Sequence, residues 1–165
     1  MKIVPPTEFL PKIPELLGPG FIEFLRKLGV IAESSGIELY LIGGAVRDLL
    51  LGRCPEDLDL FGTHAAIPLA EKLIESWHLL PSGTPAIGNY NFHPDIGLAK
   101  LYFSDPIFQG CHRIDILGED TTFLPRALYD PKRLKEFPFL ARISSAYASA
   151  GSLAVALSPK NFGTL

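Results

Sequence analysis

Apolar and polar positions alternate along the chain in blocks that predict helices and strands in turn. Apolar residues recur at helical spacing over residues 21–34, and Gly36 ends that pattern. The chain then reads as a strand at 37–44, a helix at 45–52, a strand at 56–62 and a helix at 66–77. This alternation predicts an α/β (α+β) fold in which helices flank a mixed β-sheet.

Two further strands are predicted at residues 96–104 and 111–119, with a turn between them at Asp105–Pro106. We expect these two strands to pair as antiparallel neighbours. The stretch Tyr90–Asp95 is predicted to be a loop near the sheet edge. A chain of 165 residues fits one domain of ordinary size, large enough to bury a core without disulfides or a structural metal.

Composition narrows the classes of function. The net charge of -3 gives no broad cationic surface, so contact with nucleic acid must be local or supplied by a partner. Two cysteines outside any CxxC pair predict reduced thiols. Prolines interrupt the first twenty residues where a signal peptide needs an apolar run, and the longest uncharged run, 143–158, is shorter than the ~20 residues that span a bilayer. We therefore expect a cytoplasmic protein with no membrane partner.

Two glycines lie between a predicted strand and a predicted helix. The start of a helix exposes backbone N–H groups, and Gly43 and Gly44 let an anion approach that backbone closely. Arg47, in the first helical turn, can close on the same anion through charge-assisted hydrogen bonds. The segment therefore predicts a phosphate site. The same residues also suit a tight turn in which Arg47 pairs with Asp48 at the surface.

Asp57 and Asp59 are separated by one leucine within a predicted strand. Residues two apart on a strand point to the same face, and these two lie roughly 7 Å apart along it. Two like charges at that spacing favour a cation between them, and carboxylate oxygens suit Mg²⁺ or Mn²⁺. A solvent-facing acidic strand is the alternative, but the neighbouring phosphate site favours a metal.

A third carboxylate, Asp115, stands between Ile114 and Ile116 in a predicted strand and shares its face with Arg113. If that strand lies beside the one carrying Asp57 and Asp59, the third carboxylate completes a cluster suited to two metal ions. A surface ion pair between Asp115 and Arg113 is the other interpretation.

These residues carry a family resemblance. The stretch LYLIGGAVRDLLLGRCPEDLDLF, Leu39 to Phe61, resembles the head-domain signature of tRNA nucleotidyltransferases (CCA-adding enzymes) and bacterial poly(A) polymerases, within the DNA polymerase β superfamily. The family pattern is an apolar strand, Gly-Gly-x-Val-Arg-Asp, a short Leu-rich helix and Asp-x-Asp, and each element is present. A looser resemblance runs from about Gly20 to the C-terminus, through IGLAKLYF, RIDIL, FLAR and LAVALSPKNFG.

The resemblance implies metal-dependent transfer of a nucleoside monophosphate from CTP or ATP to the 3′-hydroxyl of an RNA, expected to be tRNA, with release of pyrophosphate. It implies that Mg²⁺ or Mn²⁺ is held by three aspartates, and that nucleotide is bound by two glycines and two arginines. By the motif match the metal ligands and catalytic residues are Asp57, Asp59 and Asp115, and the nucleotide-binding residues are Gly43, Gly44, Arg47 and Arg142.

The resemblance also sets an expected domain organisation. Residues 1–165 are expected to form a single nucleotidyltransferase head domain with a Pro-rich lead over residues 1–20, and the family's neck, body and tail domains are absent. A partner chain that supplies the missing body domain is therefore a further candidate partner.

One segment departs from the family pattern. After Arg142 the family continues with a second Arg and Asp-Phe-Thr-x-Asn-Ala, associated with ribose and nucleotide recognition, whereas residues 143–152 read ISSAYASAGS. This departure favours an alternative function, a truncated or degenerate head that binds nucleotide without catalysis and serves as an interaction module. A nucleotidyltransferase acting on a protein or small molecule is a third interpretation, and the sequence does not choose between CTP and ATP.

Overall fold

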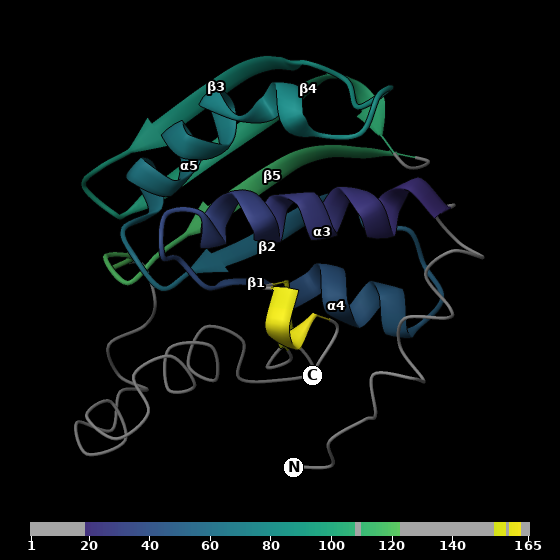
Figure 1. Cartoon of the computed structure of the whole chain (residues 1–165), viewed down its shortest axis with the longest axis horizontal. Coiled ribbons are helices and arrows are strands. Elements are labelled where there is room, and N and C mark those ends of the chain that lie inside the picture. Colours follow the sequence, from purple (N-terminus) through teal and green to yellow (C-terminus); the bar gives the residue numbers. More distant parts are fainter. Residues whose placement is uncertain (1–18, 108–109, 123–153, 158, 163–165) are drawn as a thin grey trace.

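The computed structural model describes residues 19–107, 110–122, 154–157 and 159–162. Helices and strands alternate over residues 19–79, and three strands then follow one another over residues 87–117 (Figure 1). The helical elements are α3 (Pro19–Glu33), α4 (Gly43–Leu50), α5 (Ala66–Glu75) and the short 3₁₀ helices η1 (Trp77–Leu79) and η3 (Pro159–Asn161). The strands are β1 (Leu39–Ile42), β2 (Asp57–Gly62), β3 (Ile87–His93), β4 (Leu98–Ile107), β5 (Cys111–Leu117) and β6 (Ala154–Ala156).

The six strands form one mixed sheet in the order β3-β4-β5-β2-β1-β6. Only the pairing of β2 with β5 is parallel among the described strands, and it joins two antiparallel groups. A parallel pair needs a long crossover, which here runs through α5, β3 and β4 before the chain returns beside β2. The mixed sheet flanked by helices confirms the predicted α/β (α+β) fold class.

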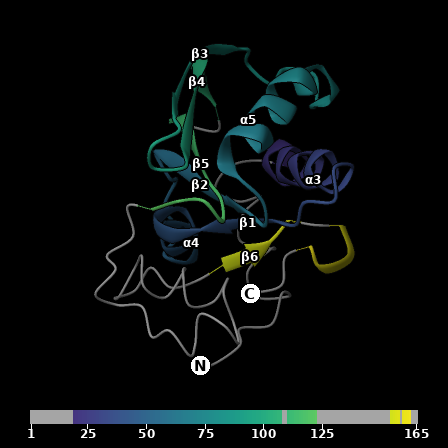
Figure 2. The same ribbon diagram turned by 90° about the vertical axis from the view of Figure 1, so that its left-hand side faces the viewer.

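Helices α3 and α5 lie on the same side of the sheet (Figure 2). The apolar face of α3 is buried, as its helical spacing predicts, while Glu23, Arg26 and Lys27 face solvent. In the strands, every second side chain points into this core, including Leu58, Leu60, Ile114 and Ile116, each 0 % exposed. The intervening residues of β2 and β5 therefore project to the other face of the sheet.

Two predictions around β3 and β4 are wrong. Residues 90–93 belong to β3, an edge strand that pairs with β4 on one side only; most of its residues are exposed, so no buried alternation marks it in the sequence. The predicted turn at Asp105–Pro106 lies within β4, which continues to Ile107. Pro106 falls where the β4–β5 register shifts, a place in a ladder that tolerates a residue without an N–H.

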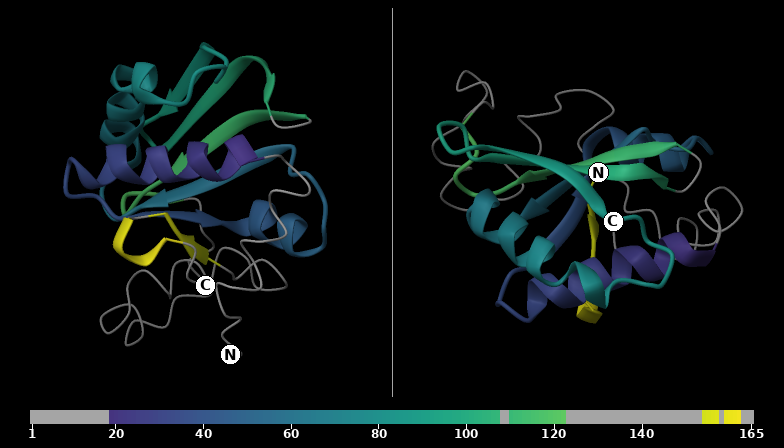
Figure 3. Two further views of the ribbon diagram at one scale, coloured as in Figure 1. Left: turned by 45° about the vertical axis from the view of Figure 1, so that its right-hand side comes forward. Right: turned by 90° about the horizontal axis from the view of Figure 1, so that it is seen from above.

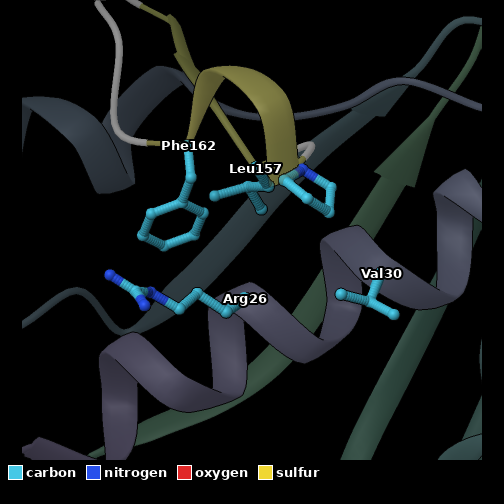
Figure 4. Close-up of a pocket in the computed structure, with 5 residues that line it drawn as sticks. Arg26, Val30, Leu157 and Phe162 are labelled. Atoms are coloured by element: carbon cyan, nitrogen blue, oxygen red, sulfur yellow. The ribbon is translucent and has the colours of Figure 1, made fainter.

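The C-terminal described segment adds a sixth strand that the sequence did not predict. β6 pairs with β1, and η3 then packs against α3 (Figure 3). The Arg26 guanidinium lies 4.8 Å from the centre of the Phe162 ring, beside a hollow of about 270 Å³ bordered by Val30 and Leu157 (Figure 4). No helix in the described ranges is long and apolar enough to cross a membrane.

Candidate active site

The first turn of α4 follows β1 directly. Gly43 begins the helix with φ of 68°, a backbone conformation that a residue with a side chain adopts only with strain. The preceding residue, Ile42, cannot cap the helix with its side chain. Instead the backbone N–H of Gly44 donates a hydrogen bond to the carboxylate of Asp59. The helix start and strand β2 are thereby joined at one point.

The strand register brings the three predicted aspartates together on one face of the sheet. Asp59 lies opposite Asp115 across the parallel β2–β5 pair, and Asp115 lies opposite Lys100 across β4–β5. In the next row, Asp57 lies opposite Arg113. Paired residues carry their side chains on the same face, so these three acids and two bases form one charged cluster.

An apolar patch borders this charged cluster on the same face. Two residues further along β2 and β5 are Phe61 and Leu117, which are 3 % exposed and pack with Ile42 and Leu98. Ile42 also lies opposite Asp59 in the β1–β2 pair. The patch restricts the access of water to Asp59 and Asp115 from this side.

Burial, together with the negative charges of Asp57 and Asp115, raises the pKa of Asp59 to about 6. The hydrogen bond from Gly44 and the charge of Arg113 act in the opposite direction but do not restore the ordinary value. The raised pKa therefore reports mainly the burial of this carboxylate and, after it, the two like charges nearby, and a cation bound at Asp59 would offset both.

Arg113 connects two of the aspartates. Its Nη2 donates a hydrogen bond of 2.5 Å to Oδ2 of Asp57. Its Nε lies 2.6 Å from Oδ1 of Asp115, yet both atoms are buried and neither makes a hydrogen bond, because the N–H does not point at that oxygen. Lys100 donates from Nζ to Oδ2 of Asp115 at 3.1 Å. Oδ1 of Asp115 is thus held by the charge of Arg113 and not by an aligned hydrogen bond.

Arg47 lies beside Gly44 but is paired with its own neighbour. Its Nε donates to Oδ1 of Asp48 at 2.9 Å, and its side chain is 48 % exposed. A Cβ placed on Gly44 would lie 3.6 Å from Nη2 of Arg47. An exposed pair of this kind contributes little to stability, so the guanidinium is free to turn toward an anion at Gly44. Arg142 and the segment 143–152 lie outside the described residues.

Two members of the cluster were not predicted as site residues. The strand period of the sequence put Arg113 on the same face as Asp115. Its contact with Asp57 could not be predicted, because that contact depends on the register between β2 and β5. Lys100 lies between Leu98 and Tyr102 on one face of strand β4 and is partly buried. A charged residue at such a position was the signal in the sequence that could have identified it as a site residue. A strand pattern identifies the face of a residue, but only pairing identifies its partner.

The donor set suits a hard divalent cation. Three carboxylates share one face, Oδ1 of Asp115 lacks an aligned hydrogen bond, and Asp59 is buried beside two like charges. Within the described residues no group of three acidic, histidine or cysteine side chains is already arranged to hold a metal ion. Arg113 and Lys100 occupy the carboxylates instead, so metal binding requires these side chains to rearrange.

Paired carboxylates on one face of the mixed sheet lie beside the start of α4 at Gly43 and Gly44. The likeness to solved CCA-adding enzymes confirms the predicted nucleotidyltransferase fold. Residues 39–83 match the family described as the poly A polymerase head domain. No curated protein sequence matches the chain. The fold and this match confirm the predicted resemblance to the head domain of tRNA nucleotidyltransferases and poly(A) polymerases.

Solved structures of CCA-adding enzymes share the fold at low sequence identity. A CCA-adding enzyme in complex with ATP is 26% identical, with a TM-score of 0.67 over 99% of this chain. A complex with CTP is 25% identical, with a TM-score of 0.64 over 94% of this chain. The Thermotoga maritima enzyme complexed with tRNA is 26% identical, with a TM-score of 0.61 over 99%. The matched regions are 33%, 32% and 32% of those chains, so this chain spans about a third of their length.

Proposed function

We propose that this chain is a nucleotidyltransferase head that binds CTP or ATP and transfers a nucleoside monophosphate to the 3′-hydroxyl of tRNA. In this reaction the 3′-hydroxyl gives its proton to solvent, its oxygen bonds to the α-phosphorus, the bond from that phosphorus to the bridging oxygen breaks, and pyrophosphate leaves. The observation that carries the proposal is the β2–β5 register, which sets Asp59 beside Asp115 next to the start of α4. The solved complexes with CTP, ATP and tRNA support the choice of substrates.

The chain's own residues bind and position the substrates. Asp57, Asp59 and Asp115 would hold Mg²⁺ or Mn²⁺, which lowers the pKa of an attacking hydroxyl and neutralises a leaving pyrophosphate. Gly43 and Gly44 leave the backbone of the first turn of α4 open to a phosphate, and Arg47 binds its oxygens through charged hydrogen bonds. Arg142 is a proposed nucleotide contact from the sequence pattern alone. Holding the reacting atoms in line is the protein's main contribution to such a transfer.

Gly44→Val is expected to spare the fold and damage triphosphate binding. A Cβ at this position meets only Nη2 of Arg47, at an ordinary contact distance, so the free energy of unfolding should change by less than about 1 kcal/mol. The added methyl groups would fill the space between the backbone and Arg47. Affinity for CTP or ATP, measured by calorimetry, should fall by more than the roughly 1.5 to 3 kcal/mol expected for Arg47→Ala, the scale of a charged hydrogen bond.

A nucleoside without phosphates provides the control for this prediction. Its binding should change little in either variant, because neither change touches the base or the sugar. Equal losses for nucleoside and triphosphate would place the phosphates elsewhere. Gly43→Ala is the matched structural variant, since its φ of 68° predicts a loss of stability that Gly44→Val does not share.

Incorporation of radiolabelled CTP or ATP into tRNA lacking its 3′ end tests the proposed activity directly. With Mg²⁺ present, the chain should label the tRNA, and Asp57→Asn should abolish the labelling because too few hard ligands remain. Triphosphate binding without labelling would contradict the proposed transfer. The absence of triphosphate binding would contradict the whole site.

The second candidate function is a head that binds nucleotide without catalysis. It is favoured by the segment 143–152, which lacks the family's Asp-Phe-Thr-x-Asn-Ala. Under this function CTP, ATP, GTP and their deoxy forms should bind within a few-fold of one another, because polar groups that read a ligand discriminate by about 1 to 3 kcal/mol each. A preference above about tenfold for one ribonucleotide would exclude a site that reads only phosphates.

A further inference from the structure

Arg113 occupies the space between the carboxylates that the proposed function assigns to a divalent cation. Its Nη2 contacts Asp57 at 2.5 Å and its Nε lies 2.6 Å from Asp115. These contacts come from the neighbouring strand β5, whose parallel register places Arg113 opposite Asp57. A guanidinium therefore bridges two proposed metal ligands.

Charge balance indicates what this bridge does to metal binding. Arg113 and Lys100 already offset two of the three carboxylates in the cluster. A divalent cation that bound alone would meet both positive side chains at close range and give the cluster a net positive charge. A nucleoside triphosphate arriving with the cation brings several negative charges and reverses that balance.

The chemistry of the guanidinium suits a change of partner. Arginine stays charged at any physiological pH, and its planar set of donors binds carboxylate and phosphate oxygens in the same way. The Arg113 side chain is 30% exposed, so its outer nitrogens can reach a ligand from the solvent side of the cluster. Its Nε is held to Asp115 by charge at 2.6 Å without an aligned hydrogen bond, so a new partner for the guanidinium would not have to replace a well-formed bond there.

We propose that Arg113 is an internal counter-ion that competes with the divalent cation for Asp57 and Asp115, and moves to triphosphate oxygens when metal and nucleotide bind together. This inference rests on the proposed function and deepens it. It makes Arg113 a positioning residue that couples metal binding to nucleotide binding. Metal alone binds weakly, and metal with triphosphate binds as a unit.

Mn²⁺ titration followed by electron paramagnetic resonance tests this coupling without any turnover. In the native chain, a non-hydrolysable CTP or ATP analogue should tighten Mn²⁺ binding by roughly tenfold or more. Arg113→Met keeps the unbranched stem of the side chain as far as the position of Nε and removes its charge and its outer nitrogens. This variant should bind Mn²⁺ alone about tenfold more tightly than the native chain does, and the analogue should then add little.

Two further variants control for charge and fold. Arg26→Gln removes a cation of α3 that lies over the Phe162 ring, outside the charged cluster. This variant should leave Mn²⁺ binding unchanged. Arg113→Lys keeps the charge without the planar donors and should bind Mn²⁺ alone as weakly as the native chain does. Thermal melts provide a second readout: Mn²⁺ without nucleotide should raise the melting temperature of Arg113→Met more than that of the native chain.

The possible outcomes separate this inference from the proposed function. If the native chain binds Mn²⁺ with the analogue but Arg113→Met leaves the affinity for Mn²⁺ alone unchanged or weaker, the inference is wrong and the metal site stands. If neither chain binds Mn²⁺ with or without the analogue, and Asp59→Asn behaves identically, both the site and the inference are wrong.

Discussion

Asp59→Asn is expected to abolish nucleotide transfer and at the same time to stabilise the fold in metal-free buffer. The Asn side chain keeps an oxygen that can accept the hydrogen bond from the backbone N–H of Gly44, so the link between β2 and α4 survives. The substitution removes a charge that burial and two neighbouring aspartates make unfavourable. Stability and activity should therefore change in opposite directions, as they do at sites held under strain for function.

The stability gain should depend on pH with a definite sign. The pKa of Asp59 is about 6 in the fold, against 3.8 for the ordinary side chain. The folded chain therefore binds this proton more tightly than the unfolded chain does, and its stability falls as the pH rises toward 6. Asp59→Asn escapes this loss, so it should be more stable by at most about 3 kcal/mol above pH 6, with little difference below pH 4.

Urea unfolding at pH 8 and at pH 4, with chelator present, measures this difference. Glu71→Gln removes an exposed carboxylate on α5 and should change the stability by less than about 0.5 kcal/mol at either pH. Equal or lower stability of Asp59→Asn at pH 8 would mean that Arg113 and Lys100 fully compensate the buried charge. In the labelling assay, Asp59→Asn should lower the rate of tRNA labelling by more than about a hundredfold. Residues that only support metal ligands contribute 10- to 100-fold to metal affinity or activity, and Asp59 is itself a proposed ligand.

The two-residue period of β2 was enough to predict half of the site. It places Asp57 and Asp59 on one face and Leu58 and Leu60 in the core, and the structure has this arrangement. The match of Asp59 with Asp115 was conditional on strand order, because a sequence carries no direct signal for which strands pair in parallel. The charge relations of Lys100 and Arg113 depend on that same register and could not be predicted.

The missed strands have a common physical cause. β3 pairs with one neighbour and is mostly exposed, and β6 has three residues, so neither shows a sustained apolar alternation. Both strands are edge strands, whose position is decided by hydrogen bonds to a partner rather than by their own side chains. The central strands β1, β2 and β5 carry the core residues and the site, and these were the strands that the sequence pattern predicted at nearly their full length.

Gly29→Ala is expected to destabilise the fold although alanine is the better helix former. Gly29 lies inside α3, where this exchange normally adds about 1 kcal/mol of stability. Here a Cβ would lie 1.8 Å from the carbonyl oxygen of Leu157, a backbone atom that cannot turn aside. The N–H of Leu157 donates to the carbonyl of Leu39 at 2.8 Å, so relieving the clash would pull the segment after β6 away from β1. Overpacking of this kind costs about 1 to 3 kcal/mol, and the steric overlap here favours the upper end.

The neighbouring substitution Val30→Ala is the matched control for Gly29→Ala. Val30 is 49% exposed on the same turn of α3, so its change to alanine should alter the free energy of unfolding by less than about 0.5 kcal/mol in urea titrations. Gly29→Ala should lower it by at least about 2 kcal/mol. A Gly29→Ala chain as stable as the native one would contradict the close packing of α3 on Leu157, and with it the placement of β6 as the sixth strand beside β1. Because β6 pairs with β1, and β1 leads directly into Gly43 and Gly44, a measured loss would also indicate that the packing of α3 on Leu157 supports the strand from which the proposed phosphate site begins.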